Sequence, residues 1–306
     1  MTEAGAIEGY PASSTTCKDL SFRISEAGRR TNFWNEMSSR VALVTGANKG
    51  IGFGLVQALA SSGAPNITVL LGSRSAARGE EAVKKIGRDN VRLLVVDVDD
   101  VASIGKAAMT IKADYGGLDI LINNAGMAWK GDAFDEKVAR GTIRTNYYGV
   151  LFCMNEFLPL MRRNARVVSI SSTVSCKALG SCSESLRGRF LADNLTIDGL
   201  NDLMEEFISD VRDGVWESKG WPKSAYGISK VGVSMLTRIM ARDNSYKNAG
   251  ILINCCCPGY VRTDMTGPHA HLSVEEGIQT PLKLAQLPEG SPSGKFWYEG
   301  KVHDWY

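Results

Sequence analysis

Short apolar segments alternate with longer amphipathic segments along the chain from residue 40 onward. The apolar segments are rich in β-branched residues and hydrophobic at nearly every position, which is typical of strands covered on both faces. The stretches between them, such as Ile51–Ser61 and Val101–Tyr115, are long enough for helices. This βαβ alternation predicts an α/β fold with a doubly wound parallel sheet of about seven strands. The predicted strands are Val41–Thr45, Ile67–Leu71, Val91–Val98, Leu118–Asn123, Arg166–Ser171, Ile251–Cys255 and, as a candidate seventh, Phe296–Tyr298.

A long polar segment before Tyr226 interrupts the alternation and predicts a helical insert over about residues 176–222. Six apolar residues inside it recur at the spacing of one helical face. Packing against the surface of the domain explains this face more simply than binding a partner does. The six residues are Leu200, Leu203, Met204, Phe207, Ile208 and Val211.

The N-terminal segment, residues 1–36, is rich in Ser, Thr, Gly and Ala and lacks periodicity, which predicts a disordered extension. A transit peptide is the alternative, but such peptides are poor in acids, and this segment contains Glu3, Glu8, Asp19 and Glu26. Met37 directly precedes the first strand and is an alternative start. We therefore expect one folded domain over residues 37–306.

The composition argues against several classes of binding partner and indicates the cellular compartment. The 35 basic and 33 acidic residues give a net charge of +2, which lacks the basic surface expected for nucleic acid or an anionic membrane. No apolar run reaches the roughly 18 residues that span a bilayer. Seven cysteines, three of them contiguous at Cys255–Cys257, form no disulfide framework and predict the reducing cytoplasm. His269 and His271 have no partners at metal-ligand spacing, so no metal site is expected.

A glycine-rich turn follows the first strand and runs from Gly46 to Gly52 as Gly-Ala-Asn-Lys-Gly-Ile-Gly. Glycines let a strand turn tightly into a helix and let a phosphate approach the backbone. The helix N-terminus adds free N–H groups and a positive potential. Many such turns contain glycine for shape alone, but the strand before and the helix after favour a dinucleotide site on a Rossmann-type domain.

The charges near the second strand favour NADPH over NADH. An NAD site usually carries an acid about 20 residues after the glycines, whereas no acid occurs from Gly46 to Gly79. Arg74 follows the second strand and Lys49 lies in the turn, and both residue types bind a 2′-phosphate. The alternative is that Arg74 is only a solvated surface residue.

Tyr226 and Lys230 lie four residues apart in a helix-like stretch, and therefore on one helical face. A free tyrosine has a pKa of about 10, and a nearby ammonium group is expected to lower it and make Tyr226 a general acid/base. Ser172 follows the fifth strand, at the sheet edge where doubly wound folds bind ligands. We expect Ser172 to face the site and Ser171 to point to the opposite face.

These motifs together resemble the short-chain dehydrogenase/reductase family from about residue 39 to the C-terminus. The long insert and the stretches 220–227 and 256–265 are similar to its carbonyl reductase subgroup, which uses NADPH. Most members have a much shorter segment between the serine and the tyrosine. The matching elements are Thr45-Gly46-x-x-x-Gly50-x-Gly52, Asp97, Asn123-Asn124-Ala125-Gly126, Asn146, Ser172, Tyr226-x-x-x-Lys230 and Pro258-Gly259.

The resemblance implies an NADPH-dependent carbonyl reductase and a role for each catalytic residue. Tyr226 would donate a proton to the carbonyl oxygen as hydride arrives from the nicotinamide, and Lys230 would bind the nicotinamide ribose. Ser172 would orient the substrate oxygen, and Asn146 would anchor a water relay behind Lys230. Negative charge develops on that oxygen, so donors aimed at it stabilise the transition state.

The resemblance also implies the cofactor-binding residues, with Asp97 at the adenine and Asn124 on the ribose side. The complete expected set is Gly46, Asn48, Lys49, Gly50, Ile51, Gly52, Arg74, Asp97, Val98, Asn124, Ala125, Gly126, Tyr226, Lys230, Pro258, Gly259, Val261 and Thr263.

Residues next to the matched motifs predict the substrate pocket. An aromatic and thioether lining suits flat apolar ketones, aldehydes or quinones. The alternative is that Trp129 and Met265 are simply packed. Carbonyl reductases commonly have tryptophan where this chain has Tyr260, and this departure bears on substrate preference. Cys257 is expected to be a small buried cysteine rather than a reactive thiol. The expected pocket residues are Trp129, Lys130, Ser172, Thr173, Tyr260 and Met265.

Two other functions remain compatible with the sequence. A hydroxysteroid or terpenoid oxidoreductase would share the cofactor and the catalytic residues and differ in pocket shape. A non-catalytic NADPH sensor can use the same fold, but it has no need of the complete catalytic set. Family members often pair through the helices around the Tyr-Lys segment; the insert would cover that surface, so we expect a monomer. The physiological substrate and the stereochemical outcome stay open.

Overall fold

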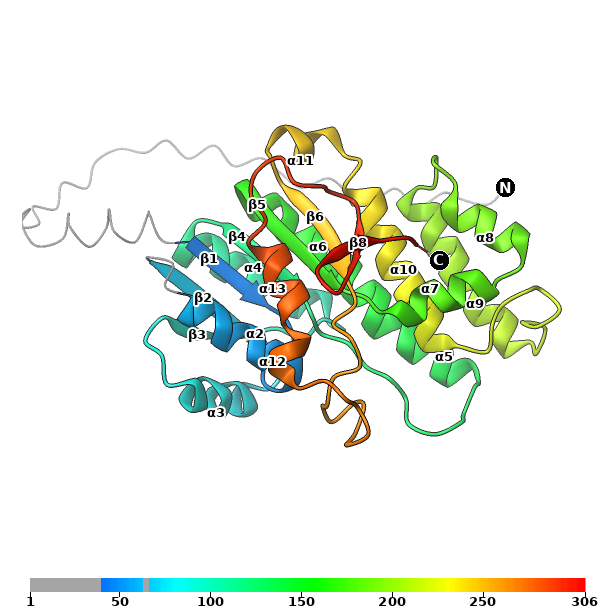
Figure 1. The fold of residues 1–306 in the computed structure, drawn as a ribbon, viewed down its shortest axis with the longest axis horizontal. Helices are drawn as coiled ribbons and strands as arrows, with labels where there is room; N and C mark the ends of the chain where they lie inside the picture. Colours follow the sequence, from blue (N-terminus) through cyan, green and yellow to red (C-terminus); the bar gives the residue numbers. More distant parts are fainter. Residues whose placement is uncertain (1–39, 63–65, 306) are drawn as a thin grey trace, which may run out of the picture.

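The computed structural model describes residues 40–62 and 66–305, so the predicted extension over 1–36 and Met37 lie outside the described residues. An eight-stranded sheet forms the centre of the molecule (Figure 1), in the order β3-β2-β1-β4-β5-β6-β7-β8. Neighbouring strands are parallel except for β7 and β8. The strands are β1 (Arg40–Val44), β2 (Ile67–Ser73), β3 (Val91–Val95), β4 (Leu118–Asn123), β5 (Met161–Ile170), β6 (Leu252–Cys256), β7 (Phe296–Tyr298) and β8 (Lys301–His303).

The central strands are buried on both faces, as their nearly continuous hydrophobicity predicts. In β1, Val41 and Leu43 pack into one hydrophobic cluster, and Ala42 and Val44 pack into the other. This division follows from the two-residue period of a strand, which sends alternate side chains to opposite faces. The predicted α/β architecture with a doubly wound sheet is therefore confirmed.

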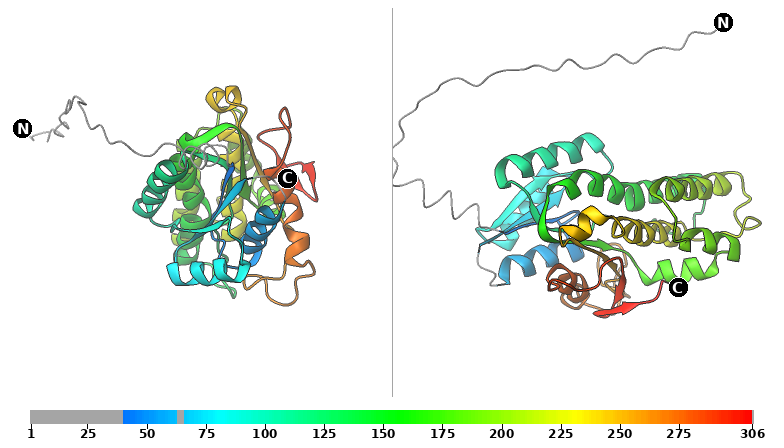
Figure 2. Two further views of the ribbon diagram at one scale, coloured as in Figure 1. Left: turned by 90° about the vertical axis from the view of Figure 1, so that its left-hand side faces the viewer. Right: turned by 90° about the horizontal axis from the view of Figure 1, so that it is seen from above.

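Helices cover both faces of the sheet (Figure 2, right). One face carries α2 (Gly50–Ser61), α3 (Ala76–Ile86) and α13 (Gln279–Ala285), with α12 (Val274–Gly277) beside α2. The other face carries α4 (Val101–Tyr115), α5 (Glu136–Ile143), the π-helix η1 (Arg144–Tyr148), α6 (Gly149–Phe157) and α10 (Ala225–Met240). Two short elements, the 3-10 helix η2 (Leu158–Leu160) and α11 (Asn244–Asn248), complete the connections.

The insert before Tyr226 folds into helices that lie beyond one end of the sheet (Figure 1). They are α7 (Thr173–Ser181), α8 (Glu184–Leu191) and α9 (Ile197–Arg212). All six apolar residues predicted for one helical face are buried on α9, which packs against α5 and α10. Trp221 closes the insert, because its Nε1 donates to Asp210 Oδ2 at 2.8 Å.

Several strand bounds differ from the sequence prediction. β3 ends at Val95 rather than Val98, because its pairing with β2 ends at Ser73 and Val95, and β1, β2 and β6 differ by one or two residues. The larger differences are in β5 and β8. β5 begins at Met161, five residues before the predicted Arg166, because Met161 pairs with Leu118 ahead of a register shift. Polar residues within that extension, among them the left-handed Asn164 (φ 59°), hide it from a hydrophobicity pattern. β8 was not predicted, since it is a three-residue exposed strand at the sheet edge. No helix in the described part of the chain is long and apolar enough to cross a membrane.

Candidate active site

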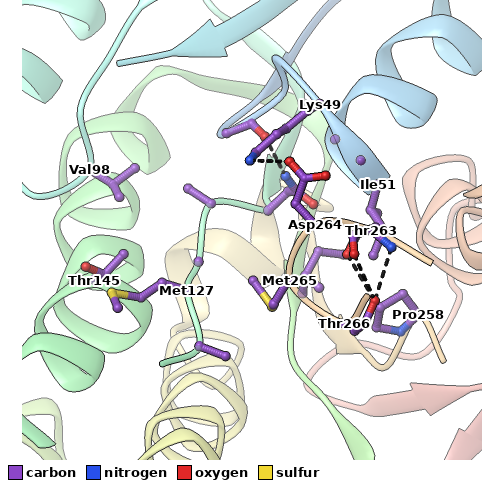
Figure 3. A pocket seen from close by; sticks show the side chains of 18 of the residues that line it. Lys49, Ile51, Val98, Met127, Thr145, Pro258, Thr263, Asp264, Met265 and Thr266 are labelled. Carbon is purple, nitrogen blue, oxygen red and sulfur yellow. Dashed lines mark hydrogen bonds and ion pairs between the residues drawn. The ribbon is translucent and has the colours of Figure 1, made fainter. Parts of the chain in front are cut away.

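A cavity of about 540 Å³ opens at the carboxyl ends of the parallel strands. The glycine turn after β1, the ends of β2 to β5, α10 and the loop after β6 supply its walls (Figure 3). This is the edge at which doubly wound sheets bind ligands. Every residue of the cofactor set expected from the sequence lines this one cavity.

The glycine turn is packed too closely to accommodate side chains at its glycine positions. Gly46 and Gly50 have positive φ angles of 64° and 58°, which favour glycine. A Cβ on Gly52 would lie 2.5 Å from Asn124 Nδ2 and 2.8 Å from the carbonyl oxygen of Gly46. That amide braces the turn, because Nδ2 donates to the backbone oxygens of Thr45 (2.9 Å) and Gly46 (3.1 Å).

The N-terminus of α2 fits a phosphate group. Lys49 is its N-cap residue, no side chain caps the helix, and its first turn contains no acid. The next three residues, Gly50–Gly52, line the cavity. Uncapped N–H groups with the helix dipole behind them form an anion site, so the residues present fit the pyrophosphate of a dinucleotide.

Two arginines mark the wall at the end of β2. Arg74 and Arg78 are exposed, line the cavity and have no ion pair among the described residues. The sequence reasoning missed Arg78, and its position four residues after Arg74 was the available signal. Lys49 is already paired: its Nζ lies 2.7 Å from Asp264 Oδ2, across the cavity (Figure 3). Both partners are exposed, so this pair contributes little stability.

The catalytic tyrosine and lysine lie on α10, which begins after its N-cap Ser224. Lys230 Nζ donates to the carbonyl oxygen of Ile170 at 2.7 Å and lies 5.8 Å from the centre of the Tyr226 ring. Ser172 hydrogen-bonds to Tyr226 and lowers its pKa. Tyr226, Lys230 and Ser172 therefore lie together at one end of the cavity.

Burial raises the pKa of Tyr226 to about 12, so the prediction that the lysine lowers it was wrong for this chain. Burial also lowers the pKa of Lys230 to about 8, and its ammonium group is held by a backbone oxygen. Desolvation is the largest cause of both shifts. At neutral pH Tyr226 is therefore a phenol, which is the form that donates a proton.

Asn146 lies behind the cavity, in the π-helix η1. It is fully buried and does not line the cavity. Its Oδ1 accepts from the backbone N–H of Met127 (2.7 Å), and its Nδ2 donates to the oxygen of Met127 (2.9 Å) and to Ser229 Oγ (3.0 Å). These bonds tie the loop after β4 to α10. The proposed water relay stays a prediction.

The expected substrate residues divide into two groups. Lys130, Ser172 and Met265 line the cavity, whereas Trp129, Tyr260 and Thr173 do not. The side chains of Trp129 (41%), Tyr260 (47%) and Met265 (41%) are partly exposed, so none of the three is core packing. Met127, which follows the motif ending at Gly126, also lines the cavity, and so do Asp99, Thr145 and Thr266, which no motif singled out.

The buried cysteine beside the site behaves as a packed residue. Cys257 is 4% exposed, and its Sγ lies 3.6 Å from Thr173 Oγ1 and accepts from the N–H of Gly259 at 3.3 Å.

A family profile for short chain dehydrogenases matches residues 40–183 and 217–271. The chain belongs to this family. The unmatched residues between the two segments contain α8 and α9 of the insert. Carbonyl reductase [NADPH] 1 of Homo sapiens is 43% identical over 273 residues, which cover 87% of this chain and 98% of that protein. Carbonyl reductase [NADPH] 3 of Rattus norvegicus is 44% identical over 276 residues, which cover 87% and 99%.

Solved short-chain dehydrogenase structures share the fold. Salutaridine reductase from Papaver somniferum matches with a TM-score of 0.77 and 30% identity, over 85% of this chain and 99% of that one. An NADPH-bound carbonyl reductase from chicken fatty liver matches with a TM-score of 0.66 and 28% identity, over 87% and 99%. The predicted resemblance to the carbonyl reductase subgroup is confirmed.

Proposed function

We infer that this protein is an NADPH-dependent carbonyl reductase that reduces ketones, aldehydes or quinones to alcohols or hydroquinones. One observation carries this conclusion: a phenol, an ammonium group and a serine lie in one cavity with the glycine turn and with two arginines that have no ion pair among the described residues. Its relatives in two mammals are named carbonyl reductase [NADPH], which supports the same activity and cofactor.

The cofactor would bind along the cavity with its pyrophosphate at the N-terminus of α2 and its 2′-phosphate between Arg74 and Arg78. Asp97 and Val98 would bind the adenine end, and Lys230 and Thr263 the nicotinamide end. Bound NADPH supplies the hydride that reaches the carbonyl carbon. An arginine pair suits the 2′-phosphate because guanidinium groups bind phosphate oxygens in a bidentate manner.

The chain's own residues supply the proton and the electrostatic stabilisation. Tyr226, neutral at pH 7, donates its phenolic proton to the carbonyl oxygen as negative charge develops there. Ser172 hydrogen-bonds to the same oxygen and orients it. The Lys230 ammonium, close to the tyrosine ring, stabilises the phenolate that remains. Asn146 keeps the loop after β4 and α10 in register behind these groups.

We also propose where the substrate enters, the extent of the domain, the oligomeric state and the location of the protein. The substrate is a small carbonyl compound that enters between Lys130 and Met265, with Trp129, Thr173 and Tyr260 beside the entrance. Residues 40–62 and 66–305, the part of the chain that the structure describes, form one domain. The protein acts as a monomer, which is supported by the packing of α9 over α5 and α10, and it acts in the cytoplasm.

The test is a turnover assay with menadione that follows NADPH absorbance, with NADH in parallel. We expect rapid oxidation of NADPH and little of NADH. The double variant Arg74→Ala/Arg78→Ala should raise the KM for NADPH by at least about 100-fold, since two hydrogen bonds to a charged group at about 1.5–3 kcal/mol each total about 3 kcal/mol or more, and leave the KM for NADH nearly unchanged.

The variant Tyr226→Phe separates an enzyme from a sensor. It should bind NADPH normally, as measured by quenching of tryptophan fluorescence, and lose turnover. Equal use of NADH by the native protein would refute the role of the arginine pair. Absence of turnover on quinones, on steroid ketones and on terpenoid ketones, with NADPH still bound, would refute the reductase.

A further inference from the structure

Three buried serine hydroxyls join the corner between β5 and α7 to the helix that carries Tyr226 and Lys230. Ser171, Ser175 and Ser234 are 1%, 3% and 2% exposed. Ser234 Oγ lies 2.7 Å from Ser171 Oγ and 3.5 Å from Ser175 Oγ. We call these three residues the serine cluster.

The serine cluster contacts the backbone of two catalytic residues. Ser171 Oγ donates to the carbonyl oxygen of Lys230 at 3.1 Å. Ser175 Oγ donates to the carbonyl oxygen of Ser172 at 2.6 Å. The side chains of Ser172 and Lys230 face the cavity, while their carbonyl groups are held from behind by the cluster.

Ser234 provides the side-chain link between α10 and the serine cluster. Its hydroxyl shares the 2.7 Å hydrogen bond with Ser171, in which either group can donate, and it also hydrogen-bonds to the Cys255 thiol of β6. Ser171 uses its own Oγ to reach the carbonyl oxygen of Lys230. Without the Ser234 hydroxyl, Ser171 would keep that bond and lose its side-chain partner on α10.

Ser234 belongs to the same helix as the catalytic pair and lies one turn after Lys230. The two helices it joins are in close contact, since a Cβ on Gly227 of α10 would lie 2.7 Å from Ala178 Cβ of α7. A small shift at this contact changes the position of Ser172 relative to Tyr226. Displacements of about 1 Å at a reacting group lower rates by about 100-fold.

We propose that Ser234 is a positioning residue for carbonyl reduction, acting through Ser171 to fix α10 against the start of α7 and so to set Ser172 against Tyr226. The inference rests on the proposed reductase function. Ser171 was expected to point to the face opposite the site; it lines the cavity, and its Oγ is bonded to α10. Ser234 touches neither substrate nor cofactor, because it does not line the cavity.

The experiment compares Ser234→Ala with Thr237→Val in the full-length protein, using menadione and NADPH. Thr237 is a matched control: it is buried on the same helix, donates to the oxygen of Val233 and, like Ser234, hydrogen-bonds to the Cys255 thiol, but it has no hydrogen bond to Ser171 or Ser175 among the described residues. We expect Ser234→Ala to lower kcat per NADPH-binding site by about 10- to 100-fold with an unchanged KM for NADPH. Thr237→Val should keep the native kcat, and Ser234→Thr, which restores the hydroxyl, should recover most of it.

A merely structural role for Ser234 predicts a different result. Ser234→Ala would then lower the melting temperature and the fraction of protein that binds NADPH, while kcat per binding site stayed native. That outcome, or an equal loss of kcat in Thr237→Val, would overturn the inference. Absence of turnover in the native protein would instead overturn the reductase function, and the inference with it.

Discussion

The protonation of Tyr226 is decided by burial rather than by its spacing from Lys230. Both groups are desolvated, so the phenol stays neutral and the ammonium loses its proton more easily. A neutral tyrosine suits reduction, in which the enzyme gives a proton. Oxidation of an alcohol would need the phenolate, which is scarce at neutral pH when the pKa is about 12.

The pH dependence of kcat/KM for NADPH should report Lys230. Its charged form exists below its pKa of about 8, and Tyr226 remains protonated up to its pKa of about 12. We expect a plateau up to about pH 7.5 and then a fall that approaches tenfold per pH unit, since kcat/KM reports the groups of the free enzyme. A profile that stays flat to pH 10 would show that the charge of Lys230 is not required.

At the scale of single residues, the sequence predicted which side chains line the site better than it predicted their pKa values. The motifs placed Tyr226, Lys230 and Ser172 correctly at one cavity, because each follows a strand or occupies a helix of the predicted sheet. The pKa values depend on neighbours distant in sequence, and Arg78 belongs to no motif. The contacts of Asn146 depend on how η1 meets α10, which no local pattern encodes.

The conformation of the glycine turn depends on the absence of a Cβ atom at Gly52. Gly52 occupies a position where a Cβ would meet backbone atoms of Ala47 and Gly46 at 2.8 Å, and backbone gives way less readily than a side chain. Glycine at this position therefore keeps the N-terminus of α2 open toward the cavity. Gly105, inside α4, has no atom within 4 Å of the same position, so it provides the comparison.

Gly52→Ala should raise the Kd for NADPH at least tenfold and destabilise the fold by about 1–3 kcal/mol, because the added methyl overpacks the turn. Gly105→Ala should leave the Kd unchanged and stabilise the fold by about 0.5–1 kcal/mol, the usual gain inside a helix. Fluorescence titration and urea unfolding measure the two quantities. Similar effects of both substitutions would mean that the turn tolerates a side chain.

Element boundaries were predicted well where hydrophobicity was continuous and poorly where polar residues intervened. The pattern gave the correct bounds for β4 and α4. It missed the first half of β5, which contains Arg162 and Arg163, and all of β8 at the exposed edge. In the insert it found α9 and not α8, whose buried positions are only Leu186 and Phe190.

At the scale of the whole molecule, the insert covers the surface formed by α5 and α10. Leu203, Met204 and Phe207 of α9 are each 1% exposed or less and close over helices α5 and α10. The Tyr147 hydroxyl of η1 also donates to Asn201 Oδ1 of α9 at 2.7 Å. A second copy of the chain would have to displace this packed helix to reach the same surface.

Our proposal of a monomer rests on that cover, and light scattering after gel filtration would test it. We expect the mass of one chain, 33.1 kDa, at all concentrations, because α9 packs over α5 and α10. Phe207→Ala should destabilise the fold by about 3–5 kcal/mol, since it leaves a cavity between α9 and the domain. Phe207→Asp should go further, separating α9 from α5 and α10 and producing association that rises with concentration. A native mass of two chains, kept when α9 is intact, would show that the protein pairs through another surface.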